Sequence, residues 1–425
     1  MATEKKIIFI DFNFSWKPNG GADVDTYHVL KKLHEKGYPL LFIGIAEDGA
    51  TDRGKFDPTQ LPFPAERVLI PEKKWNPYEI FNRIKLYLDS FKPNLIFLQH
   101  GFIIKIPVTH LIKMYYPHIP LISRIFAHEI FCLRNPLRFK HQKPCKLSIF
   151  ETPDYCRKCS LEGLKYEIKT SNITSWGKDY IRSKAYSLYF IRNYHNTVQK
   201  WDKIIVYNKT FQKELEQYKI SSVVIPGGIE PEPFLQIPLP KPKKDNEEKI
   251  ILMSGRCDEP TKGMSILFEA GKRLREKRND FKIYLTSFNI SLYNEWFIPT
   301  GWLSHEQLLK MYAIADICVV PSLWEEPFGL VVLESMATGR TVCASNIGGL
   351  SEIIQHNSTG ILFEPSNYIA LAKELENLLN TSQTRITLGS NARNYVIQNH
   401  TWEKIVNNYY IPLIEQSLPT QENHK

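Results

Sequence analysis

The chain has no long hydrophobic run. No segment of its 425 residues approaches the roughly 20 consecutive apolar residues that a membrane-spanning helix needs. Lys5 and Lys6 precede an apolar stretch, but Asp11 and Asn13 interrupt it after about half a dozen residues, too few for an export signal. These absences argue against an integral membrane protein and predict a soluble, cytoplasmic chain.

Acidic residues are scarce in one part of the chain. Residues 101–200 hold 17 Lys and Arg against 6 Asp and Glu, whereas the remainder holds 37 against 39. Such a basic region can meet an anionic lipid surface, a phosphorylated acceptor or nucleic acid, or it can be a solvated surface without a defined partner. Because no recognised nucleic-acid module accompanies the charge, no nucleic-acid partner is expected.

Apolar residues are plentiful in total, even though they are dispersed. A hydrophobic content of 43% and an aromatic content of 12% predict substantial cores, and the length suits two domains of about 200 residues each. Amphipathic stretches such as Val24–Lys36 alternate with expected strands at Lys6–Phe12, Leu40–Gly44, Asn94–Gln99 and Leu121–Phe126. This alternation predicts an α/β protein with parallel sheets covered by helices on both faces.

Prolines mark a boundary near the middle of the chain. Six of them lie between Pro226 and Pro242, and a mixture of charged and amide residues follows up to Lys249. This composition predicts an extended, solvated linker over residues 226–247. The first domain is therefore expected over residues 1–225 and the second over residues 248–395.

The segment Pro321–Glu334 is the most informative part of the sequence. It follows an expected strand, Ile317–Val320, and leads through Glu326 and Gly329 into a helix that carries Glu334. Unpaired N–H groups at a helix start attract an anion such as a diphosphate. Carboxylates beside them accept hydrogen bonds from sugar hydroxyls. The pattern points to a nucleotide-sugar site, against the plainer interpretation that both glutamates lie on a solvated face.

Several segments together resemble glycosyltransferase family 4, whose members are retaining enzymes of the GT-B fold. Beside Pro321–Glu334, the matching segments are Ile225–Glu230, Ser254–Arg256, Lys262–Gly263, Gly301–Ser304 and Asp316. They cover most of residues 200–365. The resemblance implies two Rossmann-like, doubly wound parallel-sheet domains facing a central cleft. It also implies that a C-terminal helix, residues 396–418, joins the first domain.

The resemblance assigns donor-binding roles in the second domain. It implies that Arg256 and Lys262, bracketed by Gly255 and Gly263, stabilise a departing nucleotide diphosphate without a catalytic metal. The chemistry agrees, since Arg offers phosphate a planar fork and Lys a point charge. The resemblance further implies that backbone amides around Phe328, Gly329 and Leu330 help to stabilise the diphosphate. Glu326 would hold hydroxyls of the transferred sugar, and Glu334 would hold the ribose hydroxyls.

The first domain offers further candidates through the same resemblance. Gly20 and Gly21 resemble a paired-glycine loop near the donor phosphates. His128 occupies the place of a histidine that holds the sugar or orients the acceptor, and Glu129 stands where the family most often has Asp. His100, which also follows an expected strand, is a similar candidate.

Cysteines are few, yet four of the seven gather in one insert of about residues 132–190, namely Cys132, Cys145, Cys156 and Cys159. Four thiolates can close a tetrahedral structural zinc site, and cytoplasmic placement favours zinc over disulfides. Only one Cys-x-x-Cys pair is present, so free thiols remain an alternative. Cys257, Cys318 and Cys343 lie in strand contexts and are expected to be buried thiols.

These observations converge on a glycosyltransferase that transfers a sugar from a nucleotide-diphosphate-sugar donor to a glycan, lipid-linked or small-molecule acceptor. By analogy with relatives that use lipid-linked acceptors, the basic first domain suggests peripheral contact at the inner membrane surface. Two alternatives remain, a nucleotide-sugar epimerase of GT-B architecture and a catalytically silent nucleotide-sugar-binding scaffold. The sequence specifies neither the sugar, the base nor the acceptor.

Overall fold

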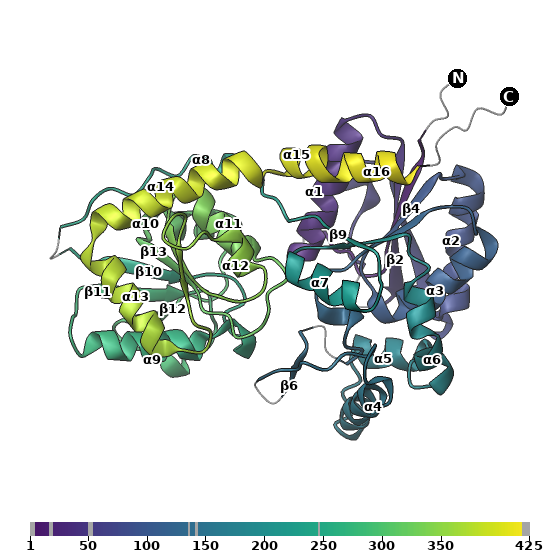
Figure 1. Ribbon diagram of the computed structural model, residues 1–425, viewed down its shortest axis with the longest axis horizontal. Coiled ribbons are helices and arrows are strands. Elements are labelled where there is room, and N and C mark those ends of the chain that lie inside the picture. The colour runs from purple at the N-terminus through teal and green to yellow at the C-terminus, as the bar shows by residue number, and fades with distance from the viewer. Residues whose placement is uncertain are drawn as a thin grey trace. The chain divides into compact units, whose positions relative to one another are not determined.

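The structure is a computed structural model that describes residues 5–16, 20–49, 54–134, 137–140, 143–244 and 247–418. The chain divides into two compact units (Figure 1). Unit 1 takes in the described residues of 1–138, 146–225 and 406–425, and unit 2 those of 139–145 and 226–405.

Unit 1 is built on a parallel sheet whose strand order is β3-β2-β1-β4-β5-β8-β9. The strands are β1 (Ile7–Asp11), β2 (Leu40–Asp48), β3 (Ala65–Pro71), β4 (Leu95–Leu98), β5 (Leu121–Arg124), β8 (Lys203–Val206) and β9 (Ser222–Val224). Every residue of β1, β4 and β5 is buried, which agrees with the apolar runs expected for strands covered on both faces.

Helices connect these strands. They are α1 (Gly21–Glu35), α2 (Pro77–Phe91), α3 (Phe102–Tyr115), α4 (Pro153–Lys169), α5 (Ser175–Arg182), α6 (Leu188–Val198), α7 (Lys209–Gln217) and α16 (Ile411–Ser417), with 3-10 turns at Pro58–Gln60, Glu72–Lys74 and His128–Ile130. Helix α2 packs on α3, and α4 packs on α6. The insert of about residues 132–190 is largely helical, with a small hairpin of β6 (Phe139–Lys140) and β7 (Lys143–Pro144).

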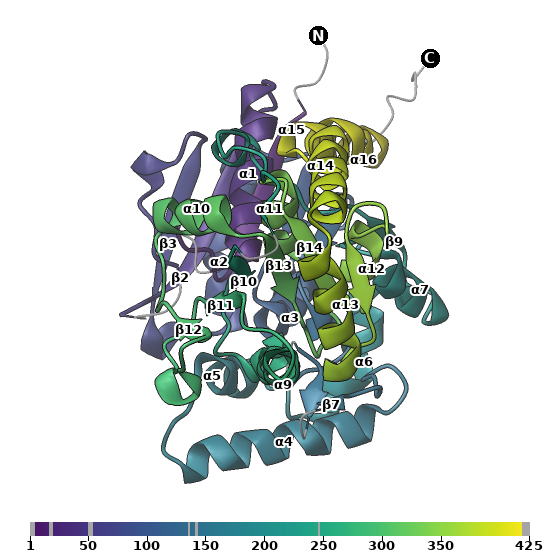
Figure 2. The same cartoon turned by 90° about the vertical axis from the view of Figure 1, so that its left-hand side faces the viewer.

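Unit 2 holds a second parallel sheet, with the strand order β12-β11-β10-β13-β14-β15. The strands are β10 (Lys249–Met253), β11 (Phe281–Leu285), β12 (Phe297–Pro299), β13 (Ile317–Val320), β14 (Thr341–Ser345) and β15 (Ile361–Phe363). The helices are α8 (Glu232–Leu235), α9 (Met264–Arg275), α10 (His305–Ile314), α11 (Leu330–Ala337), α12 (Leu350–Ile353), α13 (Tyr368–Asn380), α14 (Ser382–Asn399) and α15 (Trp402–Ile405), with 3-10 turns at Pro260–Lys262 and Ile290–Leu292. Within this unit α13 packs with α9, and α11 packs with α14 (Figure 2).

Local sequence signals explain where several helices begin and end. Asn76 caps α2 by accepting hydrogen bonds from the N–H groups of Tyr78 and Glu79, and Pro77 supplies the preset first turn. Ser304 and Gln307 form a capping box at the start of α10. Gly339 lies two residues after the end of α11 with a φ of +74°, a left-handed conformation that favours glycine at a helix end.

The proline-rich segment differs from the expectation of a solvated linker. Phe234 and Ile237 are buried. Two arginines hold the backbone of this segment: Arg340 donates to the carbonyl of Pro238 at 2.7 Å, and Arg393 to that of Leu235 at 2.6 Å. The start of the segment is therefore part of unit 2, because apolar side chains between the prolines are buried and backbone carbonyl groups accept hydrogen bonds from the two arginines.

The C-terminal helical stretch contains an irregularity at the unit boundary. A π-helical segment, Val406–Tyr410, separates α15 from α16. Pro412 lacks the N–H that an α-helix would direct to the carbonyl of Asn408, which favours a local change of helix type. The stretch from Val406 onward groups with unit 1, where Glu415 pairs with Lys5.

Candidate functional site

The loops of unit 2 that carry the sequence-predicted residues meet at the point where the strand order reverses. Strand β10 has β11 on one side and β13 on the other, so the connections after β10 and β13 diverge at their carboxyl ends. In open parallel sheets this position leaves a crevice in which ligands bind. Gly255 and Arg256 follow β10, and the segment 321–329 follows β13.

Glu326 is held in place by three donors. Its Oε1 accepts hydrogen bonds from Lys262 Nζ at 2.6 Å, Trp324 Nε1 at 2.9 Å and Ser322 Oγ at 3.1 Å. The residue is 7% exposed, so its orientation is fixed by partners rather than by solvent. Within the described residues, Oε2 has no recorded hydrogen bond. The protein therefore fixes this carboxylate through Oε1.

Glycines allow the backbones around Glu326 to approach closely. Gly263 has a φ of +80°, and a Cβ there would lie 1.8 Å from the carbonyl oxygen of Pro321. On the other side, the N–H of Gly349 donates to the carbonyl of Glu326 at 2.7 Å. A Cβ at Gly348 would lie 2.6 Å from the same oxygen. Side chains at either turn would displace the loop that carries Glu326.

Helix α11 begins directly after this loop. Gly329 precedes its first residue, Leu330, with a φ of +109°, and a Cβ at Gly329 would meet Leu350. The first N–H groups of a helix lack intrahelical acceptors and carry partial positive charge. Phe328 anchors the turn, because it is 5% exposed and packs over Gly227, where a Cβ would lie 2.6 Å from its ring. The geometry suits an anion at the start of α11.

Glu334 lies one turn further along α11. Its Oε2 accepts the hydroxyl of Tyr312 at 3.2 Å, and that hydroxyl lies 2.9 Å from Ser254 Oγ. The side chain as a whole is half-buried, but its carboxyl lies deep enough that burial raises the pKa of Glu334 to about 7, despite the opposing hydrogen bond from Tyr312. This chain of contacts links Glu334 to the loop of Gly255, which has a φ of +99°.

Arg256 behaves differently from its predicted partner Lys262. Its side chain is 55% exposed, and its Nε pairs with Glu259 at 3.1 Å. The structure therefore brings Lys262 and Glu326 into direct contact and connects Glu334 to Ser254. It leaves Arg256 as an exposed cation on the same loop, restrained only by a surface ion pair of small energetic weight.

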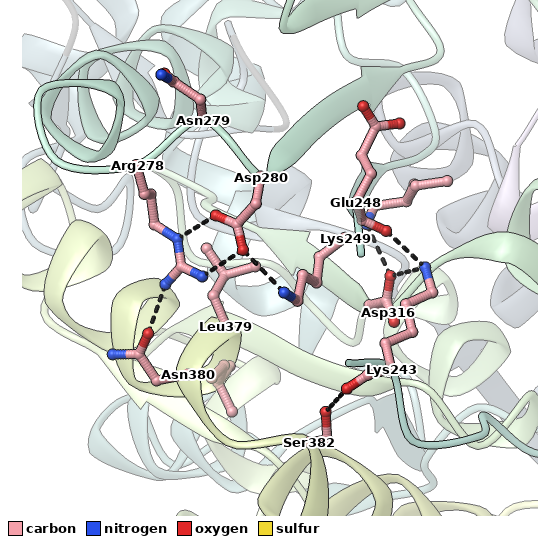
Figure 3. Close-up of polar contacts among 12 residues, drawn as sticks. Lys243, Glu248, Lys249, Arg278, Asn279, Asp280, Asp316, Leu379, Asn380 and Ser382 are labelled. Atoms are coloured by element: carbon pink, nitrogen blue, oxygen red, sulfur yellow. Dashed lines mark hydrogen bonds and ion pairs between the residues drawn. The ribbon is translucent and has the colours of Figure 1, made fainter. Parts of the chain in front are cut away.

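The opposite edge of the same sheet carries charges that satisfy one another (Figure 3). Asp280, before β11, accepts hydrogen bonds from Arg278 at 2.7 and 2.8 Å and from Lys249 at 2.8 Å. Hydrogen bonding by Arg278 lowers the pKa of Asp280 well below its usual range. Asp316, before β13, accepts from Lys243 at 2.6 Å and from the N–H of Ile250 at 2.8 Å. These groups tie strand starts together and leave little capacity for a ligand.

In unit 1 the predicted histidine is enclosed by aromatic rings. His128 is 2% exposed, and its ring lies 4.4 Å from that of Phe211 in an edge-on arrangement. Glu129 next to it turns back on the chain and accepts the N–H groups of Phe126 and Ala127 at 2.9 and 2.7 Å. The Glu129 carboxyl therefore fixes the backbone of the loop after β5, and burial raises the pKa of Glu129.

The predicted glycine pair of unit 1 lies at the start of α1. Gly20 precedes α1 in an extended conformation that any residue can adopt, and a Cβ there would meet no atom of the described residues within 4 Å. Local packing therefore does not explain a glycine at this position. Gly21 is the first residue of the helix.

The four clustered cysteines are half-buried, and the structure joins none of them in a disulfide. Cys156 and Cys159 lie three residues apart on α4, and Cys159 Sγ is 3.4 Å from Arg134 Nη1. The division into units groups Cys145 with unit 2 and the other three with unit 1. Among the residues that the structure describes, no three His, Cys, Asp or Glu side chains form a group that could hold a metal ion. The zinc site stays a prediction from the sequence.

The other three cysteines are buried, as the sequence predicts. Burial raises the pKa of Cys257 and of Cys318 to about 11, so both remain thiols.

Sequence patterns missed the side chains that orient the predicted ones. Ser322 and Trp324 lie inside the acidic motif, and their donor groups could have been assigned to Glu326 by proximity. Tyr312 lies on another helix, 22 residues from Glu334, and no local pattern connects the two. Sequence patterns also did not identify Asp11, the last residue of β1, as a residue that orients another side chain.

Known proteins resemble part of the chain in sequence. Residues 293–395 match the model of the family Glycosyl transferases group 1. An uncharacterized glycosyltransferase of Methanocaldococcus jannaschii is 33% identical over 170 residues, which are 38% of this chain and 43% of that protein. The matching segments span about half the length of the curated relatives.

Solved structures match the chain over nearly all of its length. A glycosyltransferase from Rickettsia africae has a TM-score of 0.67 at 20% identity, covering 99% of this chain and 100% of that one. The Anabaena protein HepE, solved in complex with UDP, has a TM-score of 0.64 at 17% identity, covering 96% and 100%. With its two parallel-sheet units, the chain has the GT-B fold, which confirms the fold class predicted from the sequence.

Among the helices that the structure describes, none combines the length and apolar character needed to cross a membrane.

Proposed function

We propose that the protein is a retaining glycosyltransferase that transfers one sugar from a nucleotide-diphosphate-sugar donor to an acceptor hydroxyl. The observation that carries the proposal is the Lys262–Glu326 pair, held at 2.6 Å where the sheet order of unit 2 reverses and beside the start of α11. A cation, helix amides and an oriented carboxylate are the groups that a sugar diphosphate requires. The match to glycosyl transferases group 1 supports the same class.

The proposed donor contacts follow from this geometry. Lys262 and Arg256 stabilise the charge that develops on the departing diphosphate, together with the amides around Gly329 and Leu330. Glu326 holds hydroxyls of the transferred sugar through Oε2, and Glu334 holds the ribose hydroxyls. In unit 1 the proposed contacts are the backbone of Gly20 and Gly21 to phosphate and His128 to the sugar or acceptor.

The reaction is proposed to proceed on one face of the sugar. The bond from the anomeric carbon to the diphosphate oxygen breaks, and the diphosphate leaves with the bonding electrons. The acceptor oxygen forms its new bond on the same face and passes its proton to the leaving phosphate. Glu334 cannot serve as a second carboxylate beside Glu326, since it lies on the next helix with its Oε2 bound to Tyr312.

The acceptor is proposed to be reached at an anionic membrane surface. Helix α4 exposes Tyr155, Tyr166 and Ile168, which are 51%, 68% and 52% exposed. Exposed lysines lie between and beside them, at Lys158, Lys165 and Lys169. Amphipathic helices of this composition lie in the headgroup region of anionic membranes. Co-sedimentation should occur with anionic vesicles and be lost with neutral ones or after replacing all three apolar residues by Ser; equal recovery in every case would refute the surface.

A donor panel tests the enzymatic proposal. Calorimetry with uridine, guanosine and adenosine diphosphates should identify one that binds, and the corresponding sugar nucleotides should then support transfer to a carbohydrate or lipid-linked acceptor. The uridine nucleotide is tested first, because HepE was solved with UDP. Conversion of the donor without any acceptor would indicate an epimerase. Binding without either reaction would indicate a scaffold.

A further inference from the structure

The sheet of unit 1 has its own reversal of strand order, between β1 and β4. Strand β1 pairs with β2 on one side and β4 on the other, and all three run parallel. Asp11 ends β1, and His100 lies two residues beyond β4. The two side chains therefore meet at the carboxyl edge where sheets of this class hold ligands.

Asp11 is fixed by three contacts. It is fully buried, and its Oδ1 accepts the N–H groups of Asn13 and Phe14, each at 2.8 Å. Its Oδ2 lies 2.8 Å from His100 Nδ1. Because the carboxylate accepts, Nδ1 carries the proton, and the tautomer of the imidazole is set by this bond.

The imidazole of His100 is also fixed in its plane. It stacks on Phe126 with 4.2 Å between ring centroids and 14° between planes. The next residue, Gly101, has a φ of +87°, and a Cβ there would lie 2.4 Å from Phe12 Cβ, so the chain passes close to the end of β1. The side chain is 15% exposed, and no hydrogen bond of Nε2 is recorded within the described residues. With Nδ1 held by Asp11 and part of the side chain exposed, Nε2 is the ring nitrogen that can contact a ligand.

Charged groups of four elements surround this pair. Besides Asp11, Asp23 on α1 and Glu129 after β5 act on His100, and Lys105 on α3 lies near Glu129 and Asp11. Burial alone would lower the pKa of His100, but Asp11 and, less strongly, Asp23 and Glu129 raise it. Burial lowers the pKa of Lys105 to about 8, and its Nζ donates to the carbonyls of Gln99 and Arg124.

These surroundings discriminate between the parts of a sugar nucleotide. Three carboxylates next to the imidazole disfavour a phosphate, which moreover can only accept hydrogen bonds. A sugar hydroxyl can donate to a neutral Nε2 or accept from a protonated one, so it suits either state of His100.

We propose that His100 is a substrate-contacting residue of unit 1 whose Nε2 hydrogen-bonds a hydroxyl of the bound carbohydrate, and that Asp11 is the positioning residue that orients it. The inference rests on the proposed transferase function. The sequence offers His100 only as a candidate similar to His128; the bond from Asp11 now gives it a fixed orientation and a specific contact.

Kinetics of His100→Ala test the proposal, with His34→Ala on the exposed end of α1 as the matched control. We expect kcat/KM for transfer to fall by about 10- to 100-fold, the loss typical of one hydrogen bond to a charged or polar partner. The Kd of the free nucleoside diphosphate should stay unchanged, and His100→Asn should recover part of the rate. Asp11→Asn should lower the pH at which the kcat/KM profile titrates, because it removes the charge that raises the pKa of His100.

The outcomes separate this proposal from the one on which it rests. Wild-type transfer with an unaffected His100→Ala variant would overturn the role of His100 alone. Weakened nucleoside diphosphate binding by that variant would overturn the assignment to a hydroxyl. If Asp11→Asn does not fold, the titration of His100 by NMR in the wild type decides: its signals should shift on addition of sugar donor and not with nucleoside diphosphate alone, and an unresponsive His100 would refute the contact. Absence of any transfer by the wild type would remove both proposals.

Discussion

The two sheets place different chemistry at equivalent positions. At the reversal point of unit 2, a carboxylate, Glu326, pairs with a lysine, Lys262, next to the start of a helix. At that of unit 1, a carboxylate, Asp11, pairs with His100 and raises its pKa, beside further carboxylates. The same architecture thus offers one position suited to a diphosphate and one suited to hydroxyls. The comparison indicates that strand order fixes where a site forms, whereas the residues after each strand fix what it holds.

Removing the cation of unit 2 should have the largest effect. Lys262→Ala is expected to reduce kcat/KM by about 100- to 1000-fold, the usual cost of losing one group that stabilises charge in the transition state. The exposed Lys272 on α9, replaced in the same way, serves as the matched control. Steady-state turnover and thermal unfolding measure both variants. A Lys262→Ala enzyme that is folded and fully active would remove the distinction between the two reversal points.

Neutralising the carboxylate of unit 2 should come next. Glu326→Gln preserves size, but it removes the charge that Lys262, Ser322 and Trp324 bind. We expect kcat/KM to fall by about 10- to 100-fold with nucleoside diphosphate binding nearly intact, since the lost contact is to the sugar. Calorimetry and turnover separate the two effects. A selective loss of nucleotide affinity would instead assign Glu326 to the nucleotide.

Glu334 should reveal itself through the pH dependence of stability. Burial raises its pKa to about 7 in the folded protein, so the folded state holds this proton more tightly than the unfolded state. Stability is therefore lost as pH rises from about 4.5 to 7, and the penalty persists above that range. Relative to the wild type, Glu334→Gln should have a free energy of unfolding that is about 1–3 kcal/mol more favourable at pH 8 than at pH 5, measured by denaturant unfolding. An equal change in the free energy of unfolding at both pH values would contradict a raised pKa for the Glu334 carboxyl.

The charged groups at the amino ends of the strands in unit 2 are expected to affect stability rather than turnover. Asp280→Asn should destabilise the protein by about 1–2 kcal/mol without changing turnover at a permissive temperature. The folded-state pKa of Asp280 is lowered, so its contribution is present above pH 4 and disappears as pH falls further. Thermal unfolding at neutral pH and at pH 3 measures this difference. A variant with normal stability and reduced turnover would show that this edge takes part in function.

Most of the fold followed from local patterns, whereas side-chain pairings did not. Val24–Lys36 and Leu121–Phe126 were expected as a helix and a strand, and the structure has α1 and β5 there, because hydrophobic periodicity reflects burial directly. The helices α4 and α5 were not predicted, since their apolar residues are split between a buried and an exposed face. Pairings such as Asp11 with His100, 89 residues apart, depend on strand order, which periodicity does not encode.

The central claim is that the reversal point of unit 2 binds a nucleotide diphosphate through Lys262. Titration calorimetry of uridine, guanosine and adenosine diphosphates into the wild type and Lys262→Ala tests it most directly. We predict that one of the three binds the wild type and that the substitution weakens its binding at least tenfold, or about 1.4 kcal/mol. Failure of all three to bind the wild type, or equal affinity for both proteins, would contradict the account.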